Sequence, residues 1–195
     1  NIPTTKINTA QTMTNIERLQ KGLVERDLPA VVISNLPAIY WLTGFTGSFG
    51  LAVVTRDSGI FLTDSRYTIQ AAEQCSDLPV DSFRSPQKAE EFLAEHLARL
   101  GVSKLAFDRN HVTVATLEKW KTALSGVELL PTDDPIDDLR MIKSAEEVAK
   151  VRHCCGISDK ALELLMTIAR PGVSELQLFW AFEDFLRQHS ATSAF

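Results

Sequence analysis

The sequence has too little positive charge to suit a nucleic-acid backbone. Its 20 lysines and arginines are outnumbered by 25 aspartates and glutamates, which gives a formal net charge of −5. A nucleic-acid-binding protein normally carries a basic face, and no local basic cluster occurs along this chain. Long apolar runs are missing as well, and none approaches the roughly 20 residues that cross a membrane as a helix. We therefore expect neither a nucleic acid nor a membrane as a partner.

Cysteine is also scarce. The three cysteines, Cys75, Cys154 and Cys155, are an odd number and lack the regular spacing of a disulfide framework. The N-terminal segment NIPTTKINTAQTM is polar and lacks the apolar stretch of a secretory signal peptide. Together these features predict a reduced, cytoplasmic protein.

Metal-ligating side chains are present, but they are not grouped as a site. His153 directly precedes Cys154 and Cys155, and adjacent positions of a helix point in different directions, which suits a tetrahedral site poorly. We expect two small buried thiols beside a partly exposed imidazole. His96 and His111 are isolated and are expected at the surface or in the core. An acidic run is interpreted as a solvated linker with helix caps rather than a cation site: Asp133, Asp134, Asp137 and Asp138.

Apolar residues make up 45% of the chain, enough for a core, and short β-branched runs alternate with segments of helical periodicity. Helices are expected between the strands, one of them capped by Asp64 and another opening at Pro86. Two strands are close enough to form a hairpin. The pattern predicts an α/β fold with a mixed β-sheet flanked by helices. Strands are expected at residues 30–33, 49–55, 60–63, 80–83, 103–108 and 127–131.

The composition changes where an acidic, proline-marked segment, PTDDPIDDLRMIKS, follows the last expected strand. We interpret residues 1–131 as an α/β domain and residues 132–143 as a linker. Residues 144–195 contain only helical patterns. Capping boxes at Ser144 and Ser174 begin two helices there, because each serine has Glu or Gln three positions later.

A glycine-rich stretch, LTGFTGSFGLAVVT, raises the question of a phosphate-binding loop. Its glycines are Gly44, Gly47 and Gly50. A phosphate loop opens a helix, whose free N–H groups then face the anion, and in one common form it ends in lysine. Here the glycines lead into a β-branched strand, and no lysine follows the last of them. The stretch therefore does not fit a nucleotide loop.

Aromatic side chains surround these glycines. Tyr40, Trp41, Phe45 and Phe49 give the turn more bulk than a plain connection between a helix and a strand needs. Aromatic residues on a glycine-supported loop often line a pocket or an interface. The alternative is a simple connection in which glycine allows positive φ and close packing.

Two segments, NLPAIYWLTGFTGSFGLAVVT and GIFLTDSRYTIQA, resemble the N-terminal domain of the Xaa-Pro peptidases, which are aminopeptidase P and the prolidases, with creatinase as a related enzyme. Two later segments, DDLRMIKSAEEVAKVRHCCGISDKAL and IARPGVSELQL, resemble the start of the catalytic domain of the same family. These motifs occur in the family's order and cover most of the chain.

The resemblance implies a ribonuclease-H-like N-terminal domain followed by helices that open a pita-bread catalytic domain. In this family two divalent metal ions (Mn, Co or Zn) are bound by two Asp, one His and two Glu. They share a water that attacks the peptide bond before proline, since paired metals lower the pKa of the water and stabilise the developing oxyanion. A proline-containing peptide is the implied substrate.

The resemblance also implies that those ligands lie outside this sequence. The last residues, SATSAF, are similar to the link that precedes the metal-binding strands in the family. We therefore expect an N-terminal part that is cut before the metal-binding core. It should have no catalytic residue, metal ligand or cofactor of its own, and it should be inactive alone.

The resemblance further implies a homo-oligomer, with a dimer expected, in which this domain lines the rim of the neighbour's substrate pocket. It places Phe45, Asp64, Arg66 and Tyr67 there. An arginine pairs readily with a substrate carboxylate, and an aromatic side chain closes a pocket. The alternatives are a helix cap for Asp64, a local salt bridge for Arg66 and core packing for Phe45.

Other functions share the same motifs. A non-catalytic homologue that binds peptides or proteins, as in histone-chaperone relatives, would keep this fold and lose the metal ligands. A creatinase-like amidinohydrolase is a third possibility. The sequence does not separate an aminopeptidase from a dipeptidase, because the difference depends on how far the pocket admits the substrate.

Overall fold

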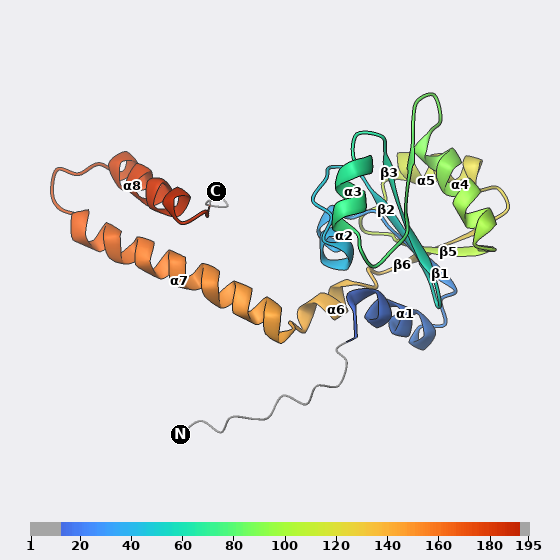
Figure 1. Cartoon of the computed structure of the whole chain (residues 1–195), viewed down its shortest axis with the longest axis horizontal. Coiled ribbons are helices and arrows are strands. Elements are labelled where there is room, and N and C mark those ends of the chain that lie inside the picture. The colour runs from blue at the N-terminus through green and yellow to red at the C-terminus, as the bar shows by residue number, and fades with distance from the viewer. Residues whose placement is uncertain (1–12, 192–195) are drawn as a thin grey trace, which may run out of the picture. The chain divides into compact units, whose positions relative to one another are not determined.

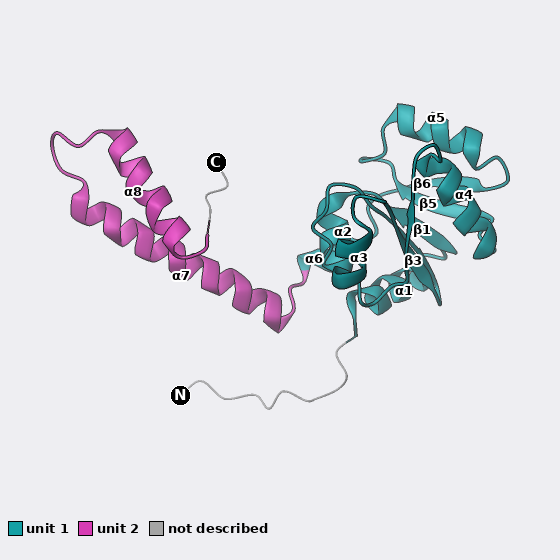
Figure 2. Ribbon diagram, turned by 45° about the horizontal axis from the view of Figure 1, so that its top comes forward, with its two compact units in different colours: residues 1–141 teal, residues 142–195 magenta. Residues whose placement is uncertain are grey.

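The computed structural model describes residues 13–191, so most of the polar N-terminal segment and the end of SATSAF lie outside the described part. The chain divides after Met141 into two compact units (Figure 2). Unit 1, which ends at Met141, contains a β-sheet with helices around it, and unit 2, which begins at Ile142, contains a pair of helices.

Unit 1 is built on a six-stranded mixed sheet (Figure 1). Its strands are β1 (Ala30–Ile33), β2 (Leu51–Thr55), β3 (Gly59–Asp64), β4 (Val80–Phe83), β5 (Lys104–Asp108) and β6 (Glu128–Thr132). Their order is β4-β3-β2-β1-β5-β6. β2 is antiparallel to β1 and β3, and the other neighbours are parallel. β2 and β3 form the expected hairpin, and the chain crosses to the other side of β1 after β4.

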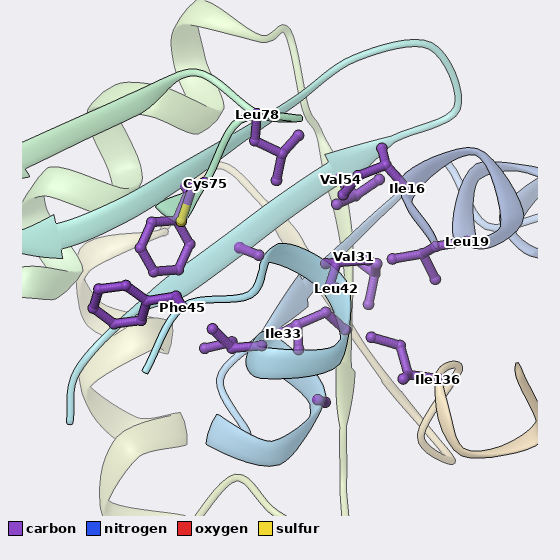
Figure 3. Packing of buried hydrophobic residues seen from close by; sticks show 14 of the residues in the cluster. Ile16, Leu19, Val31, Ile33, Leu42, Phe45, Val54, Cys75, Leu78 and Ile136 are labelled. Atoms are coloured by element: carbon purple, nitrogen blue, oxygen red, sulfur yellow. The ribbon is translucent and has the colours of Figure 1, made fainter. Parts of the chain in front are cut away.

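Side chains alternate along β1 and divide the sheet into two faces. Val31 and Ile33 belong to one buried cluster, and Ala30 and Val32 belong to the other. The first cluster (Figure 3) includes buried residues of α1 (Asn15–Glu25), α2 (Leu36–Thr43) and α3 (Thr68–Gln74). The second cluster includes buried residues of α4 (Ala89–Arg99) and α5 (Val114–Ala123).

Helices close both faces of the sheet. Leu19 and Leu23 of α1, and Leu93 and Leu97 of α4, have no exposed surface. Full burial of one such side chain contributes roughly 1.5–3 kcal/mol. The resulting helix–sheet–helix arrangement confirms the expected α/β class with a mixed sheet.

The segment interpreted as a linker, residues 132–143, contains structure of its own. A short helix, α6 (Asp137–Met141), lies within it. Ile136 just before this helix is fully buried in the first cluster, and Asp138 forms an ion pair with Arg26 at 2.9 Å. This acidic segment is therefore held to unit 1 by an apolar side chain and an ion pair, rather than being fully solvated.

Unit 2 is a hairpin of α7 (Ala145–Ile168) and α8 (Glu175–Gln188). Ser144 and Ser174 form the expected capping boxes at their starts. Gly172 in the turn between them has a φ of 95°, which favours glycine. No helix in residues 13–191 is both long and apolar enough to cross a membrane. Within the described part of unit 2, three residues are buried: Ala161, Glu183 and Leu186.

Two helices of unit 1 begin later than the sequence predicts. Asp64 does not cap α3, because it still pairs with β4 as the last residue of β3, and the helix begins at Thr68. α4 begins at Ala89 rather than Pro86, because Lys88 still has an extended backbone with φ −95° and ψ 154°.

Candidate functional site at the sheet edge

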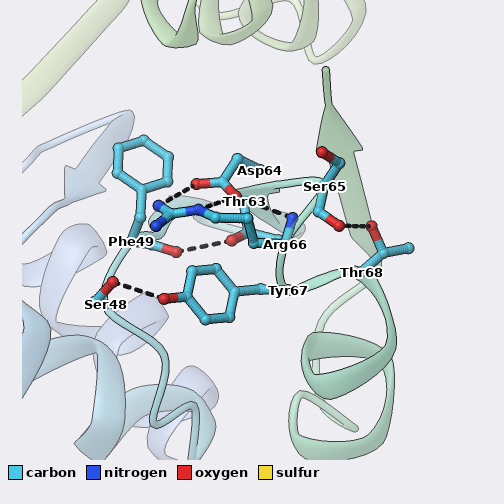
Figure 4. A network of polar contacts seen from close by, with 8 residues as sticks. All are labelled: Ser48, Phe49, Thr63, Asp64, Ser65, Arg66, Tyr67 and Thr68. Carbon is cyan, nitrogen blue, oxygen red and sulfur yellow. Dashed lines mark hydrogen bonds and ion pairs between the residues drawn. The ribbon is translucent and has the colours of Figure 1, made fainter. Parts of the chain in front are cut away.

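Two segments meet at one edge of the sheet in unit 1. They are the loop before β2, residues 44–50, and the segment at the end of β3, residues 64–67, which together we call the edge site. Because β2 and β3 are antiparallel neighbours, the start of one lies beside the end of the other. The Thr63 hydroxyl donates a hydrogen bond of 2.7 Å to the carbonyl oxygen of Phe49 and holds the two segments together (Figure 4).

Each of the three positions Gly44, Gly47 and Gly50 in the loop has its own structural reason to be glycine. Gly44 ends α2 in the left-handed region, with φ of 77°. A Cβ at Gly47 would lie 2.2 Å from Cζ of Phe45, and a Cβ at Gly50 would lie 2.4 Å from Cζ of Phe61. Glycine is therefore required here for a turn and for close contact with aromatic rings, not for a phosphate.

Phe45 is the buried centre of the edge site. Only 2% of its surface is exposed, and its ring packs against Phe61 at 4.8 Å and edge-on against Tyr67 at 5.6 Å between centroids. The Tyr67 hydroxyl lies 2.6 Å from the Ser48 hydroxyl (Figure 4), and this hydrogen bond lowers the pKa of Tyr67. The buried ring of Phe45 therefore supports the ring of Tyr67, and the hydrogen bond to Ser48 connects Tyr67 to the loop.

Asp64 and Arg66 form a two-pronged ion pair. Nε of Arg66 donates to Oδ1 of Asp64 at 2.9 Å, and Nη2 donates to Oδ2 at 2.8 Å. The backbone N–H of Arg66 also donates to Oδ1 at 3.0 Å. The Arg66 side-chain hydrogen bonds hold the pKa of Asp64 below its usual range. This arrangement confirms the local salt bridge that the sequence left open, whereas the helix-cap alternative is wrong.

Arg66 is nevertheless available to a ligand. Its side chain is 65% exposed, against 18% for Asp64. Its guanidinium also lies 5.1 Å from the centre of the Tyr67 ring, which limits its orientation. Within the described residues, the N–H groups that do not face Asp64 have no hydrogen-bond partner. A planar guanidinium of this kind suits a carboxylate.

An apolar hollow of about 460 Å³ adjoins the loop. Tyr40 and Leu36 of α2 expose 58% and 39% of their surface beside it. The edge site therefore combines an exposed cation with an exposed aromatic and aliphatic surface. The hollow is lined by Leu36, Pro37, Tyr40, Phe45, Thr46, Gly47 and Ser48.

The sequence did not single out the residues that anchor the loop. Oε1 of Gln74 accepts hydrogen bonds from the backbone N–H of Thr46 at 3.0 Å and from Gln70 at 3.2 Å. Ser48 holds Tyr67, as described above. One usable signal was the spacing of Gln70 and Gln74, which places both side chains on one side of α3.

The cysteines of unit 2 differ from their expected environment. Cys154 and Cys155 are exposed, as is His153, so the interpretation of two buried thiols is wrong. The reason is that α7 packs against a single helix within its unit, which leaves most of its circumference uncovered. Cys75 in unit 1 is buried, and burial raises the pKa of its thiol.

The histidines and acidic residues of unit 1 have structural partners or lie apart. His96 is buried and its Nε2 lies 3.0 Å from Oδ2 of Asp81, whereas His111 is exposed. Asp133 pairs with Arg109 at 2.8 Å. Across residues 13–191, no three or more His, Cys, Asp or Glu side chains are grouped so that they could hold a metal ion.

The family model for the creatinase/prolidase N-terminal domain matches residues 15–142. Because this match covers more than half of the sequence, the chain belongs to that family. The matched region coincides with the sheet, its covering helices and the edge site.

Individual relatives agree with this assignment. The chain is 30% identical over 179 residues to uncharacterized peptidase YqhT of Bacillus subtilis (strain 168), covering 92% of this chain and 50% of that protein. Among solved structures, an Xaa-Pro dipeptidase from Bacillus anthracis superposes with a TM-score of 0.83 at 27% identity, over 90% of this chain and 48% of that one. The N-terminal domain of cytoplasmic peptidase PepQ from Mycobacterium tuberculosis H37Rv gives 0.59 at 34% identity, over 65% and 98%. The chain spans about half the length of the curated relatives it matches.

Proposed function

We propose that this chain is the N-terminal part of a metal-dependent Xaa-Pro peptidase, either an aminopeptidase P or an Xaa-Pro dipeptidase, that acts in the cytoplasm on proline-containing peptides. The observation that carries the proposal is the family match over residues 15–142. It is supported by the likeness to a Bacillus anthracis Xaa-Pro dipeptidase, which continues beyond that region to 90% of this chain.

The described residues do not fit the two divalent metal ions (Mn, Co or Zn) of such an enzyme, since they include no group of three or more potential ligands. We therefore assign no metal ligand to residues 13–191. In the proposed enzyme, the ligands come from sequence that follows it, and this chain alone is inactive.

The edge site is proposed as the contribution of this chain to a homodimer. Arg66 is exposed, and Asp64 and Tyr67 orient its guanidinium. Among the described residues, its remaining N–H groups have no partner, so they can bind a substrate carboxylate. Tyr40 offers an exposed apolar surface beside the same loop. This combination suits the rim of a neighbour's pocket for a short peptide, where Arg66 binds the substrate carboxylate and Phe45 supports the loop from below.

Hydrolysis of the dipeptide Ala-Pro tests the proposal for the whole enzyme. The parent protein, supplied with Mn²⁺, Co²⁺ or Zn²⁺, should release alanine and proline, and the 195-residue chain under identical conditions should release none. Failure of the parent with all three metals, together with substituted metal ligands in its sequence, would favour the non-catalytic binding homologue instead.

Arg66→Gln in the parent protein tests the edge site. We expect KM for Ala-Pro to rise about tenfold with little change in kcat, because a charge-assisted hydrogen bond to the substrate contributes roughly 1.5–3 kcal/mol. The matched control is Arg56→Gln, another exposed arginine, which pairs with Asp27 at 2.7 Å beyond the opposite end of β2. Equal KM values for the two variants would contradict a role of Arg66 in binding the substrate.

A further inference from the structure

A second hollow, of about 470 Å³, lies in unit 1 at the carboxyl ends of β1 and β5. Ser34 follows β1 directly, and His111 to Thr113 connect β5 to α5. The chain builds the sheet outward from β1 in one direction as far as β4 and then returns to place β5 on the other side. Such a reversal in strand order opens a crevice at the carboxyl ends of the strands, where α/β proteins bind ligands.

The base of this hollow is apolar. Trp120 of α5 is 4% exposed and Leu51 of β2 is 7% exposed, and Phe49 and Val112 are partly buried beside them. The volume falls within the range of small-molecule sites, about 300–1,000 Å³. The base would therefore accept an apolar group of modest size.

Three ionisable side chains lie around the hollow without partners. Within the described residues, Glu90 of α4, Lys119 of α5 and His111 form no hydrogen bond or ion pair through their side chains, although all three line the hollow. By contrast, Arg109, which directly follows β5, is paired with Asp133 at 2.8 Å. Charges of both signs thus remain available beside one apolar base.

The start of α5 adds to the positive side of the hollow. Thr113 caps this helix and accepts a hydrogen bond of 3.2 Å from the backbone N–H of Thr116. The N-terminus of a helix carries a partial positive charge that favours an anionic group. Lys119 lies on the same helix, so a carboxylate is favoured on this side. Glu90 lies in the first turn of α4, and its own negative charge is what would attract an ammonium group.

We propose that this hollow binds a free α-amino acid with an apolar side chain. The ammonium group of the ligand would face Glu90, its carboxylate would face Lys119 and the start of α5, and its side chain would rest on Trp120 and Phe49. A phosphate or nucleotide fits less well, because Glu90 would repel its charge, and a neutral apolar ligand would use none of the free charges. The site consists of unit 1 residues alone, so this inference does not depend on the proposed peptidase activity.

Titration of the ¹⁵N-labelled chain with L-phenylalanine tests the site by NMR. We expect saturable shifts of backbone amides in residues 48–51 and 111–116, with a dissociation constant in the millimolar range or tighter. N-acetyl-L-phenylalanine and L-phenylalaninamide each lack one charge and should bind at least fivefold more weakly. The absence of saturable shifts in these residues, or equal binding of all three compounds, would overturn the proposal.

Two variants locate the charged contacts. Glu90→Gln and Lys119→Gln should each weaken binding of L-phenylalanine at least fivefold, whereas Lys121→Gln, an exposed lysine on α5 that does not line the hollow, should leave it unchanged. Dispersed spectra of the variants will show that they are folded. If Lys119→Gln binds as the wild type does, or if Lys121→Gln weakens binding as much, the assignment is wrong.

Discussion

The two units of this chain differ in how completely they bury their apolar side chains. Unit 1 has helices on both faces of its sheet, and large side chains from every layer are fully buried, as Leu19, Phe61 and Leu93 illustrate. Unit 2 is a single pair of helices on which Trp180 exposes 59% of its surface and Met166 exposes 75%. Further exposed apolar residues of unit 2 are Ile142, Val148, Val151, Leu162, Leu176 and Phe179.

This difference separates a domain with its own core from a helical element without one. Two helices alone bury too little surface to offset the entropy of ordering them, and most helical stability in proteins comes from tertiary packing. The chain also spans only about half the length of its curated relatives. Within the described residues, unit 2 therefore has no core comparable with that of unit 1.

The largest expected effect is a core truncation in unit 1. Leu93→Ala should lower the free energy of unfolding of unit 1 by about 2–5 kcal/mol, because the removed side chain is fully buried and leaves a cavity. Leu162→Ala is the matched change in unit 2, where the leucine is 56% exposed, and it should change stability by less than about 0.5 kcal/mol. Urea unfolding followed by NMR cross-peaks of each unit measures both, and equal losses would contradict the comparison.

A smaller effect is expected at the edge site. Gly47→Ala should destabilise unit 1 by about 1–3 kcal/mol, because the new Cβ would lie 2.2 Å from Cζ of Phe45 and 2.9 Å from Cδ1 of Tyr67. Gly156→Ala in α7 meets no atom within 4 Å, and it should stabilise its helix by up to about 1 kcal/mol. Urea unfolding and helical circular dichroism distinguish these opposite signs. A neutral Gly47→Ala would show that the loop can rearrange around Phe45.

The smallest effect concerns the ion pair of the edge site. The pKa of Asp64 is lowered in the folded state, so the pair stabilises the fold fully above the unfolded-state pKa of about 3.9. That stability is lost as the pH falls through the lower folded-state pKa. Asp64→Asn should cost up to about 1 kcal/mol at pH 7, and this difference from the wild type should shrink below about pH 4.

Urea unfolding at pH 7, 4 and 2 measures this trend. Asp27→Asn is the control, because its carboxylate is 97% exposed in its pair with Arg56 and should contribute less. A cost for Asp64→Asn that stays constant across these pH values would contradict the role of the ion pair.

Much of unit 1 could be predicted from its sequence, because the signals are local. The strands expected at residues 30–33, a β-branched run, and at residues 80–83 coincide with β1 and β4. In unit 2, the capping boxes expected at Ser144 and Ser174 depend on equally local signals, and both are confirmed. These features depend on side chains within a few residues of one another.

The features that were missed depend on distant contacts. α6 forms beside Ile136, whose side chain is buried in the first cluster of unit 1. The acidic composition of this segment does not reveal such a contact. The ring of Phe45 packs on Phe61 and Tyr67, which lie outside its own loop, so the sequence could leave core packing of Phe45 only as one of two alternatives. Cys154 is exposed because α7 packs against a single helix within its unit, whereas the prediction rested on how often free cysteines are buried.

Native-state hydrogen exchange of the 195-residue chain tests the central comparison most directly. We expect amides of β1, β2 and β5 to exchange only through global unfolding of unit 1, because both faces of the sheet are covered. Amides of α7 and α8 should exchange through a much smaller opening free energy. Equal protection of the two units, with the same dependence on urea, would contradict the account by showing that unit 2 shares the core stability of unit 1.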